Sequence, residues 1–106
     1  MKFKFNYLAK KMWRIEGEYA YEVSEESRSI EHFFRRGTRI TFKLSDNHWL
    51  ILNPNDEFNS QMTACYTKPL KNGELTYYEK KITLGFFKLE TIFEFTETDQ
   101  VKKETS

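Results

Sequence analysis

The sequence predicts a mainly β fold, a small antiparallel barrel or a strongly bent sheet of six to eight strands with one short helix. Three observations support this prediction. Apolar and polar residues alternate along several segments, turn-forming residues separate them, and ten Phe, six Tyr and two Trp can supply a core. With 106 residues, the chain is long enough to bury one core. We expect a single globular β domain over residues 1–98 and a polar tail over residues 99–106.

The stretch MWRIEGEYAYEV, residues 12–23, shows the alternation most sharply. Its odd positions hold the large apolar and aromatic side chains Trp13, Ile15, Tyr19, Tyr21 and Val23. Its even positions hold Arg14 and three glutamates. Because successive strand side chains point to opposite faces, we expect one strand whose aromatic side packs inward. Gly17 would lie within this strand, where it leaves interior space or permits a sharp bend.

Residues 24–37, SEESRSIEHFFRRG, break the alternation and favour a short helix over about residues 25–36. The apolar residues with the i, i+3, i+4 spacing of one helical face are Ile30, Phe33 and Phe34. Acidic residues lie at the expected N-terminal end and basic residues at the C-terminal end, where each complements the helix dipole. Gly37 follows, as is common after a helix. A further strand over residues 29–36 is the alternative.

A hairpin is predicted over residues 38–53. TRITFKL alternates cleanly, and HWLILN, residues 48–53, is apolar on both faces. The intervening Ser45-Asp46-Asn47 favours a turn, because short polar side chains bond to their own backbone. We therefore expect the second strand of this hairpin to be covered on both sides.

A second hairpin is predicted around Asn72-Gly73, because both central positions of a tight turn need positive φ. SQMTACYT precedes this turn and alternates again. The last strand lies within FFKLETIFEFTE, where Phe and Leu alternate with charged residues. Between the turn and this strand the path stays open: residues 79–81 form a turn, or Gly85 marks a bulge.

The order of strands, short helix and β-meander resembles that of the small intracellular lipid-binding and lipocalin-like barrels. The resemblance lies in architecture alone, because the sequence contains no motif of these families. It implies a barrel with a helix near its opening, and a shared fold by itself assigns no function.

Potential catalytic and metal-binding residues form no motif in the sequence. His32, His48 and Cys65 lack metal-site spacing; we expect His48 to be a solvated turn residue and Cys65 a small buried one. There is no G-x-S-x-G motif and no Gly-rich phosphate loop, and the glutamates of residues 12–23 share one face instead of contrasting environments. We expect no metal, no cofactor and a binding protein rather than an enzyme.

Net charge and cysteine content bear on partners and location. A net charge of +1 creates no global attraction to nucleic acid or an anionic membrane. The lone Cys65 can form no intrachain disulfide, the N-terminal residues lack a signal-peptide pattern, and no apolar run is long enough to span a membrane. We expect a cytoplasmic protein without a membrane partner.

The main functional hypothesis is a small interaction module with an aromatic-lined pocket. Tyrosine hydroxyls that point inward need partners, which favours an interior open to water or to a ligand with a polar group. The candidate ligand-binding residues are Trp13, Tyr19, Tyr21, Phe33, Phe34 and Tyr66. The partner would be a protein or a compact apolar ligand, with the predicted helix covering the mouth.

The alternative hypothesis is nucleic-acid or polyanion binding through the basic segment 35–43. Its candidate residues are Arg35, Arg36, Arg39 and Lys43. Alternation points Phe42 away from Arg39 and Lys43, so the basic cluster would bind phosphates without an aromatic stacking platform. A third possibility is a homodimer through KFKFNYL, because Lys2 and Lys4 are typical of protected edge strands.

Overall fold

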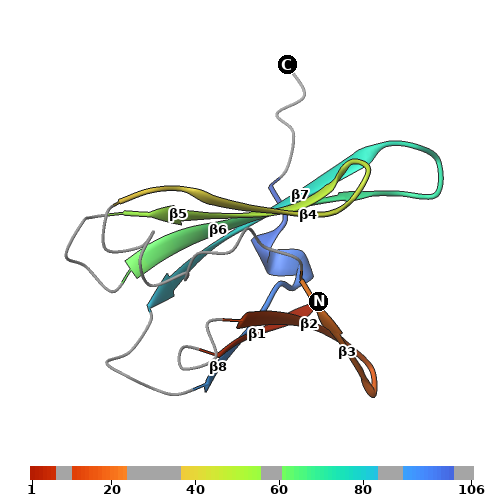
Figure 1. The fold of residues 1–106 in the computed structure, drawn as a ribbon. Coiled ribbons are helices and arrows are strands. Elements are labelled where there is room, and N and C mark those ends of the chain that lie inside the picture. Colours follow the sequence, from red (N-terminus) through yellow and green to blue (C-terminus); the bar gives the residue numbers. More distant parts are fainter. Residues whose placement is uncertain (7–10, 24–36, 56–60, 84–89, 102–106) are drawn as a thin grey trace.

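The computed structural model describes residues 1–6, 11–23, 37–55, 61–83 and 90–101. Within these residues, eight strands form two four-stranded antiparallel sheets, one facing the other (Figure 1). The predicted β class and strand number are confirmed. The described strands of the two sheets share no ladder, so they do not close into a barrel, and the alternative of bent sheets fits. The predicted helix at residues 25–36 lies outside the described residues.

Sheet A has the strand order β3-β2-β1-β8. Its strands are β1 (Lys2–Asn6), β2 (Lys11–Glu16), β3 (Tyr19–Glu22) and β8 (Glu90–Glu94). The prediction that the N-terminal strand is an edge is wrong, because β1 pairs with β2 on one side and with β8 on the other. Lys4 instead forms a salt bridge with Glu90 on the neighbouring strand, at 3.0 Å.

Sheet B has the strand order β4-β5-β6-β7. Its strands are β4 (Ile40–Ser45), β5 (His48–Pro54), β6 (Gln61–Pro69) and β7 (Leu75–Thr83). Both predicted hairpins are confirmed; Asn47 and Gly73 adopt positive φ in their turns, at 58° and 86°. Because β7 is continuous, residues 79–81 form no turn. Trp49 is 40% exposed, so β5 is not covered on both sides as expected.

Residues 12–23 form a hairpin, so the prediction of one long strand is wrong. Gly17 and Glu18 make a two-residue turn between β2 and β3, and Gly17 adopts a φ of 59°. Glycine favours positive φ at the first position of such a turn. On β2 the even-numbered positions face inward: Met12 is buried and pairs with Phe5. Trp13, which was predicted to face inward, lies on the opposite face.

The core lies between the two sheets. Sheet A contributes Phe3, Phe5 and Met12, and sheet B contributes Phe42, Leu50 and Leu52. Tyr66 of β6 joins the layers, since its ring lies 5.4 Å from that of Phe3 in an edge-on arrangement and 5.4 Å from that of Phe95 in a stacked one. Such pairs add about 0.5–1.5 kcal/mol each beyond simple burial.

Residues at the end of the described chain connect sheet A to β7 of sheet B. A 3-10 turn, η1 (Glu97–Asp99), follows β8, and the backbone N–H of Val101 donates to the Tyr77 carbonyl on β7 at 2.8 Å. Lys80 of β7 also donates to the Glu94 carbonyl of β8 at 2.9 Å. The predicted tail, residues 99–106, thus begins inside a segment that contacts β7.

Candidate functional site

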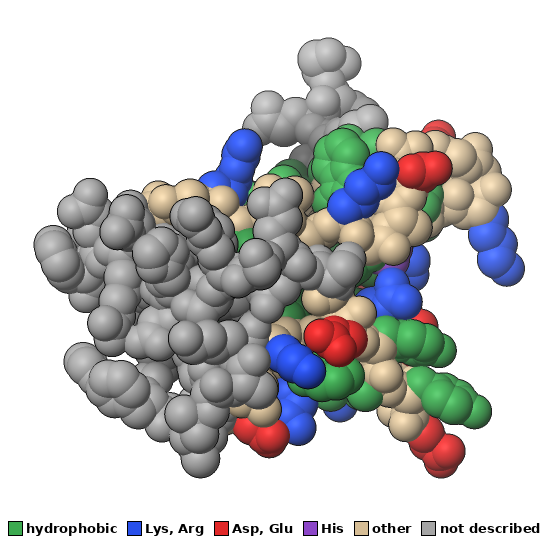
Figure 2. All heavy atoms as spheres, viewed as in Figure 1, with side chains coloured by type: hydrophobic (Ala, Val, Ile, Leu, Met, Phe, Trp, Pro, Cys, Tyr) green, Lys and Arg blue, Asp and Glu red, His purple; other side chains and the backbone are tan. Residues whose placement is uncertain are grey.

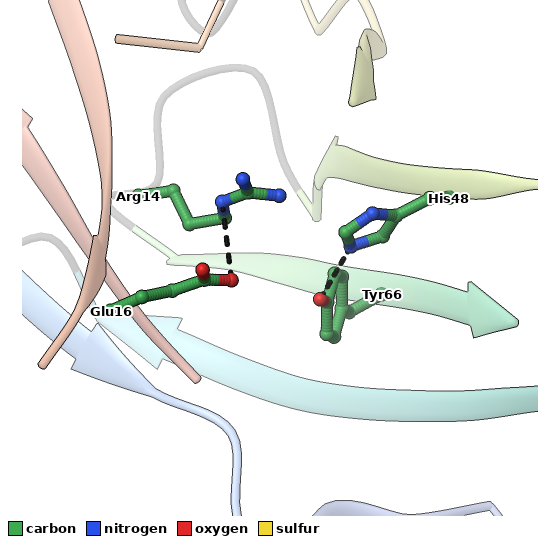
Figure 3. Close-up of polar contacts among 4 residues, drawn as sticks. All are labelled: Arg14, Glu16, His48 and Tyr66. Atoms are coloured by element: carbon green, nitrogen blue, oxygen red, sulfur yellow. Dashed lines mark hydrogen bonds and ion pairs between the residues drawn. The ribbon is translucent and has the colours of Figure 1, made fainter. Parts of the chain in front are cut away.

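Four polar residues meet between the sheets and form the inter-sheet cluster: Arg14, Glu16, His48 and Tyr66 (Figure 3). Arg14 and Glu16 come from β2, whereas His48 begins β5 and Tyr66 lies on β6. Strand alternation places each of them, because Arg14 pairs with the core residue Phe3 and Tyr66 pairs with the core residue Leu50. The cluster therefore lies at the polar edge of an otherwise apolar core.

His48 and Tyr66 form a hydrogen bond across neighbouring strands of sheet B, with His48 Nε2 and the Tyr66 hydroxyl 2.5 Å apart. Burial lowers the pKa of His48, and the positive charges of Arg14 and Lys68 lower it further against the opposing effect of Glu16. Burial also raises the pKa of Tyr66 to about 12. The neutral imidazole thus accepts the hydrogen bond that the tyrosine hydroxyl donates. The prediction that His48 is a solvated turn residue is wrong.

Arg14 connects this hydrogen bond to the β2–β3 hairpin. Its Nε lies 3.5 Å from Glu16 Oε1, and its guanidinium carbon lies 5.2 Å from the centre of the Tyr21 ring. The buried Nε makes no hydrogen bond within the described part of the chain, so the pair with Glu16 is an ion contact only. A cation over an aromatic ring is attracted by about 0.5–1 kcal/mol where the pair is exposed. Arg14 therefore orients Tyr21.

Among the described strands, β3 lies at one edge of sheet A, and we call Tyr19–Glu22 the β3 edge. All four residues are exposed, with Tyr19 at 69% and Tyr21 at 46%. Figure 2 shows hydrophobic and acidic side chains projecting at the lower right, where Figure 1 places this hairpin. These tyrosines lie on the same face as Arg14 and Glu16, because paired residues of adjacent strands share a face.

The β3 edge also presents backbone hydrogen-bonding groups. The N–H of Val23 donates to the Met12 carbonyl at 3.0 Å, which identifies these two residues as a hydrogen-bonded pair. In an antiparallel ladder such pairs alternate with pairs that make no backbone hydrogen bonds to each other. Ala20 and Glu22 therefore belong to the second kind, and their N–H and C=O groups point away from β2 toward the open edge.

The four described residues of the predicted ligand-binding set lie at three different places in the fold. Trp13 lies on the outer face of sheet A, Tyr19 and Tyr21 lie on the β3 edge, and Tyr66 is buried with 2% exposure. Phe33 and Phe34 lie outside the described residues. Arg14 alone relates two of the predicted residues, because it contacts the Tyr21 ring and acts electrostatically on Tyr66.

The residues of the polyanion hypothesis are only partly described. Arg39 and Lys43 are exposed, and Lys43 lies 3.4 Å from Asp46, which offsets its charge. Arg35 and Arg36 lie outside the described residues. The structure therefore shows one of the four bases, Lys43, already beside a carboxylate.

Cys65 lies on the outer face of sheet B and is half-buried. Burial raises the pKa of its thiol, and the negative charge of Glu79 raises it further. Asn53 Nδ2 lies 3.7 Å from the sulfur. The thiol is therefore protonated at neutral pH and has no activated-nucleophile environment. In the part of the chain that the structure describes, no three His, Cys, Asp or Glu side chains gather as metal ligands would.

Comparisons with protein-family models, with curated proteins and with solved structures found no significant match to this chain. Among the described residues, no helix has the length and apolar character needed to cross a membrane.

Proposed function

We propose that the protein is a small non-enzymatic binding module whose protein partner adds an extended strand to the β3 edge. The observation that carries this proposal is an exposed edge strand that combines outward backbone groups at Ala20 and Glu22 with the exposed rings of Tyr19 and Tyr21. Added strands gain affinity from main-chain hydrogen bonds and specificity from the side chains beside them.

Two features support a protein partner over a compact apolar ligand. The described aromatic interior is occupied by its own side chains, because the rings of Phe3, Phe93 and Phe95 contact one another, and Phe3 and Phe95 also contact Tyr66. The aromatic side chains of the β3 edge are instead exposed at the surface. Tyrosine is enriched in protein–protein interfaces relative to the rest of the surface. The proposal includes a cytoplasmic location, where a lone thiol such as Cys65 stays reduced.

The β3 edge is short, which is one protection against strand addition, but it lacks two others, lysine and proline. Protected edges carry lysine, proline, a bulge or an inward-pointing charge. The sequence of β3 is YAYE, without lysine or proline. Its length of four residues limits promiscuous pairing, and its two tyrosines offer a defined contact to a matching strand.

The test removes one outward donor without touching the β2–β3 ladder. Ala20→Pro deletes the N–H that points to the open edge, and proline is tolerated where an edge N–H faces solvent. Ala20→Thr is the matched control, because it keeps this N–H. Binders would be selected from a displayed library of random nonapeptides, with each variant's fold checked by NMR.

We expect selected peptides to slow amide hydrogen exchange at Ala20 and Glu22, to bind the Ala20→Thr variant, and to lose at least tenfold in affinity for the Ala20→Pro variant. Selected peptides that bind both variants equally, or a selection that yields no binder at β3, would contradict the proposal.

A further inference from the structure

We infer that the strand received by the β3 edge is cationic, with a lysine or arginine that stacks on Tyr19 beside the carboxylates of Glu16 and Glu18. This inference rests on the proposed function and specifies the chemistry of its partner. It is carried by one occupied cation site on this face, by a neighbouring tyrosine ring over which no described cation lies, and by the charge of the hairpin.

The occupied site is the pair of Arg14 and Tyr21. The guanidinium carbon lies 5.2 Å from the ring centre, and Glu16 lies 3.5 Å from the same guanidinium. A tyrosine ring and a carboxylate thus already hold one cation on the inward face of the hairpin. Tyr21 is accordingly less exposed than Tyr19, at 46% against 69%.

Tyr19 lies on the same face of the hairpin and pairs with the same glutamate that contacts Arg14. Tyr19 pairs with Glu16, and this pair is the next one on the same face after the pair of Arg14 and Tyr21. No cation of the described residues lies over its ring. Among the large hydrophobic residues of the described sheets, Tyr19 is the most exposed. A cation supplied by a partner would repeat at Tyr19 the arrangement that Arg14 makes at Tyr21.

The hairpin also carries surplus negative charge. Residues 16–22, EGEYAYE, contain three glutamates and no base. Glu16 is beside Arg14, and Glu22 is a loose 3.9 Å from Lys11. Glu18, at the turn, is exposed and makes no ion pair with any described residue. A partner strand with positive charge is therefore complementary to this edge, whereas an acidic strand would be repelled.

Sheet geometry fixes where the cation must lie in the partner. Side chains of an added strand alternate between the two faces, and those opposite Tyr19 lie about 4.5–5.5 Å from it between Cβ atoms. Residues on that face meet Tyr19 and Tyr21, and residues on the other face meet Ala20 and Glu22. Because Arg14 already occupies the Tyr21 ring, partner strands should carry a basic residue at the position opposite Tyr19 and need no continuous basic run.

The experiment uses the same random nonapeptide library, read by sequencing after selection on the intact protein. Peptides that the Ala20→Pro variant also binds are set aside, so that only edge binders count. We expect Lys and Arg to be enriched at one position of the aligned edge binders, the position opposite Tyr19. Synthetic copies of the best binders would then be titrated against Tyr19→Leu and Glu18→Gln variants.

Two matched controls separate the proposed contact from general surface effects. Tyr77→Leu removes an exposed tyrosine of sheet B, and Glu74→Gln removes an exposed carboxylate of the β6–β7 turn. We expect Tyr19→Leu and Glu18→Gln each to weaken binding about two- to fivefold, the range of one exposed cation–π or ion contact. The control substitutions should leave binding unchanged.

The outcomes distinguish this inference from the proposed function. Edge binders without Lys or Arg enrichment, or equal affinity for the Tyr19→Leu and Tyr77→Leu variants, would overturn the cationic partner and leave strand addition intact. Selection that returns only peptides bound equally by the Ala20→Pro variant would overturn both. A second copy of this chain as the edge's occupant would be revealed by dimerisation that Ala20→Pro abolishes, and it would also overturn the inference.

Discussion

The two ends of one ladder row across sheet A have opposite surroundings. The row runs Tyr21, Arg14, Phe3 and Phe93 across β3, β2, β1 and β8. At its β8 end Phe3 and Phe93 are 0% and 6% exposed, whereas at its β3 end Tyr21 is 46% exposed. All four side chains point to the same face of the sheet.

The difference follows from what lies opposite each end. The β8 end faces sheet B and is joined to β7 by Lys80 and by the segment after η1. The β3 end lies beyond the core, and its Tyr21 packs against Arg14 of the polar inter-sheet cluster. Phenylalanine, with no polar group, occupies the first environment; tyrosine, which has an apolar body and a polar tip, occupies the second. Under the proposed function, folding and recognition therefore depend on different ends of one sheet.

The largest expected effect breaks the buried end of this row. Phe3→Ala should lower the free energy of unfolding by about 3–5 kcal/mol, because it removes a ring that contacts Tyr66, Phe93 and Phe95. Tyr21→Ala should cost less than about 1 kcal/mol. Urea unfolding followed by tryptophan fluorescence measures both, with Phe3→Leu as a milder variant. Equal losses at the two ends would contradict the comparison.

An intermediate effect is expected where the core meets the inter-sheet cluster. Tyr66→Phe keeps the ring and removes the hydroxyl that donates to His48, so it should cost about 0.5–1.5 kcal/mol at neutral pH. Because the fold raises the pKa of Tyr66 to about 12 from a usual value near 10, the wild type should lose stability as pH rises from about 10 toward 12. Stability measured against pH should lack this loss in the variant; identical alkaline profiles would count against the buried hydroxyl.

The smallest effect concerns the charge of His48. Because the fold lowers its pKa below the usual value of about 6.5, the unfolded chain takes up the proton first as pH falls. The contribution of neutral His48 is full above that value and declines as pH drops below it. His48→Gln should flatten this acid-side slope. NMR titration should show Arg14→Met raising the pKa of His48 and Glu16→Gln lowering it; shifts in the opposite directions would refute the cluster's geometry.

Much of the fold could be predicted from the sequence because its signals are local. Asn72-Gly73 and Ser45-Asp46-Asn47 each specify a turn through a few neighbouring residues, and both hairpins formed as expected. The β2–β3 turn was missed because Gly17 interrupts an alternation that continues on both sides of it. Across a two-residue turn the inward face changes from even to odd positions, as the pair of Glu16 and Tyr19 shows, although apolar residues occupy the odd positions of both strands.

The site was less predictable because it depends on which side of each strand faces the other sheet. Alternation identifies two faces but does not state which of them is buried. On β2 the apolar side chains of Trp13 and Ile15 led to the prediction that the odd positions face inward. Instead, Arg14 and Met12 face inward, because they pair with the core residues Phe3 and Phe5. His48 shares its phase with the buried Leu50, a signal that the sequence did contain.

The exposure of β3 has a consequence for natural variation of this protein. None of its four residues is buried, so substitutions there disturb the core little and are tolerated by folding. A mutation that preserves folding is removed by selection only if it impairs an activity. Retention of Tyr19 and Tyr21 in diverging descendants of this gene would therefore record a partner, whereas retention of Phe3 would record only the need to fold.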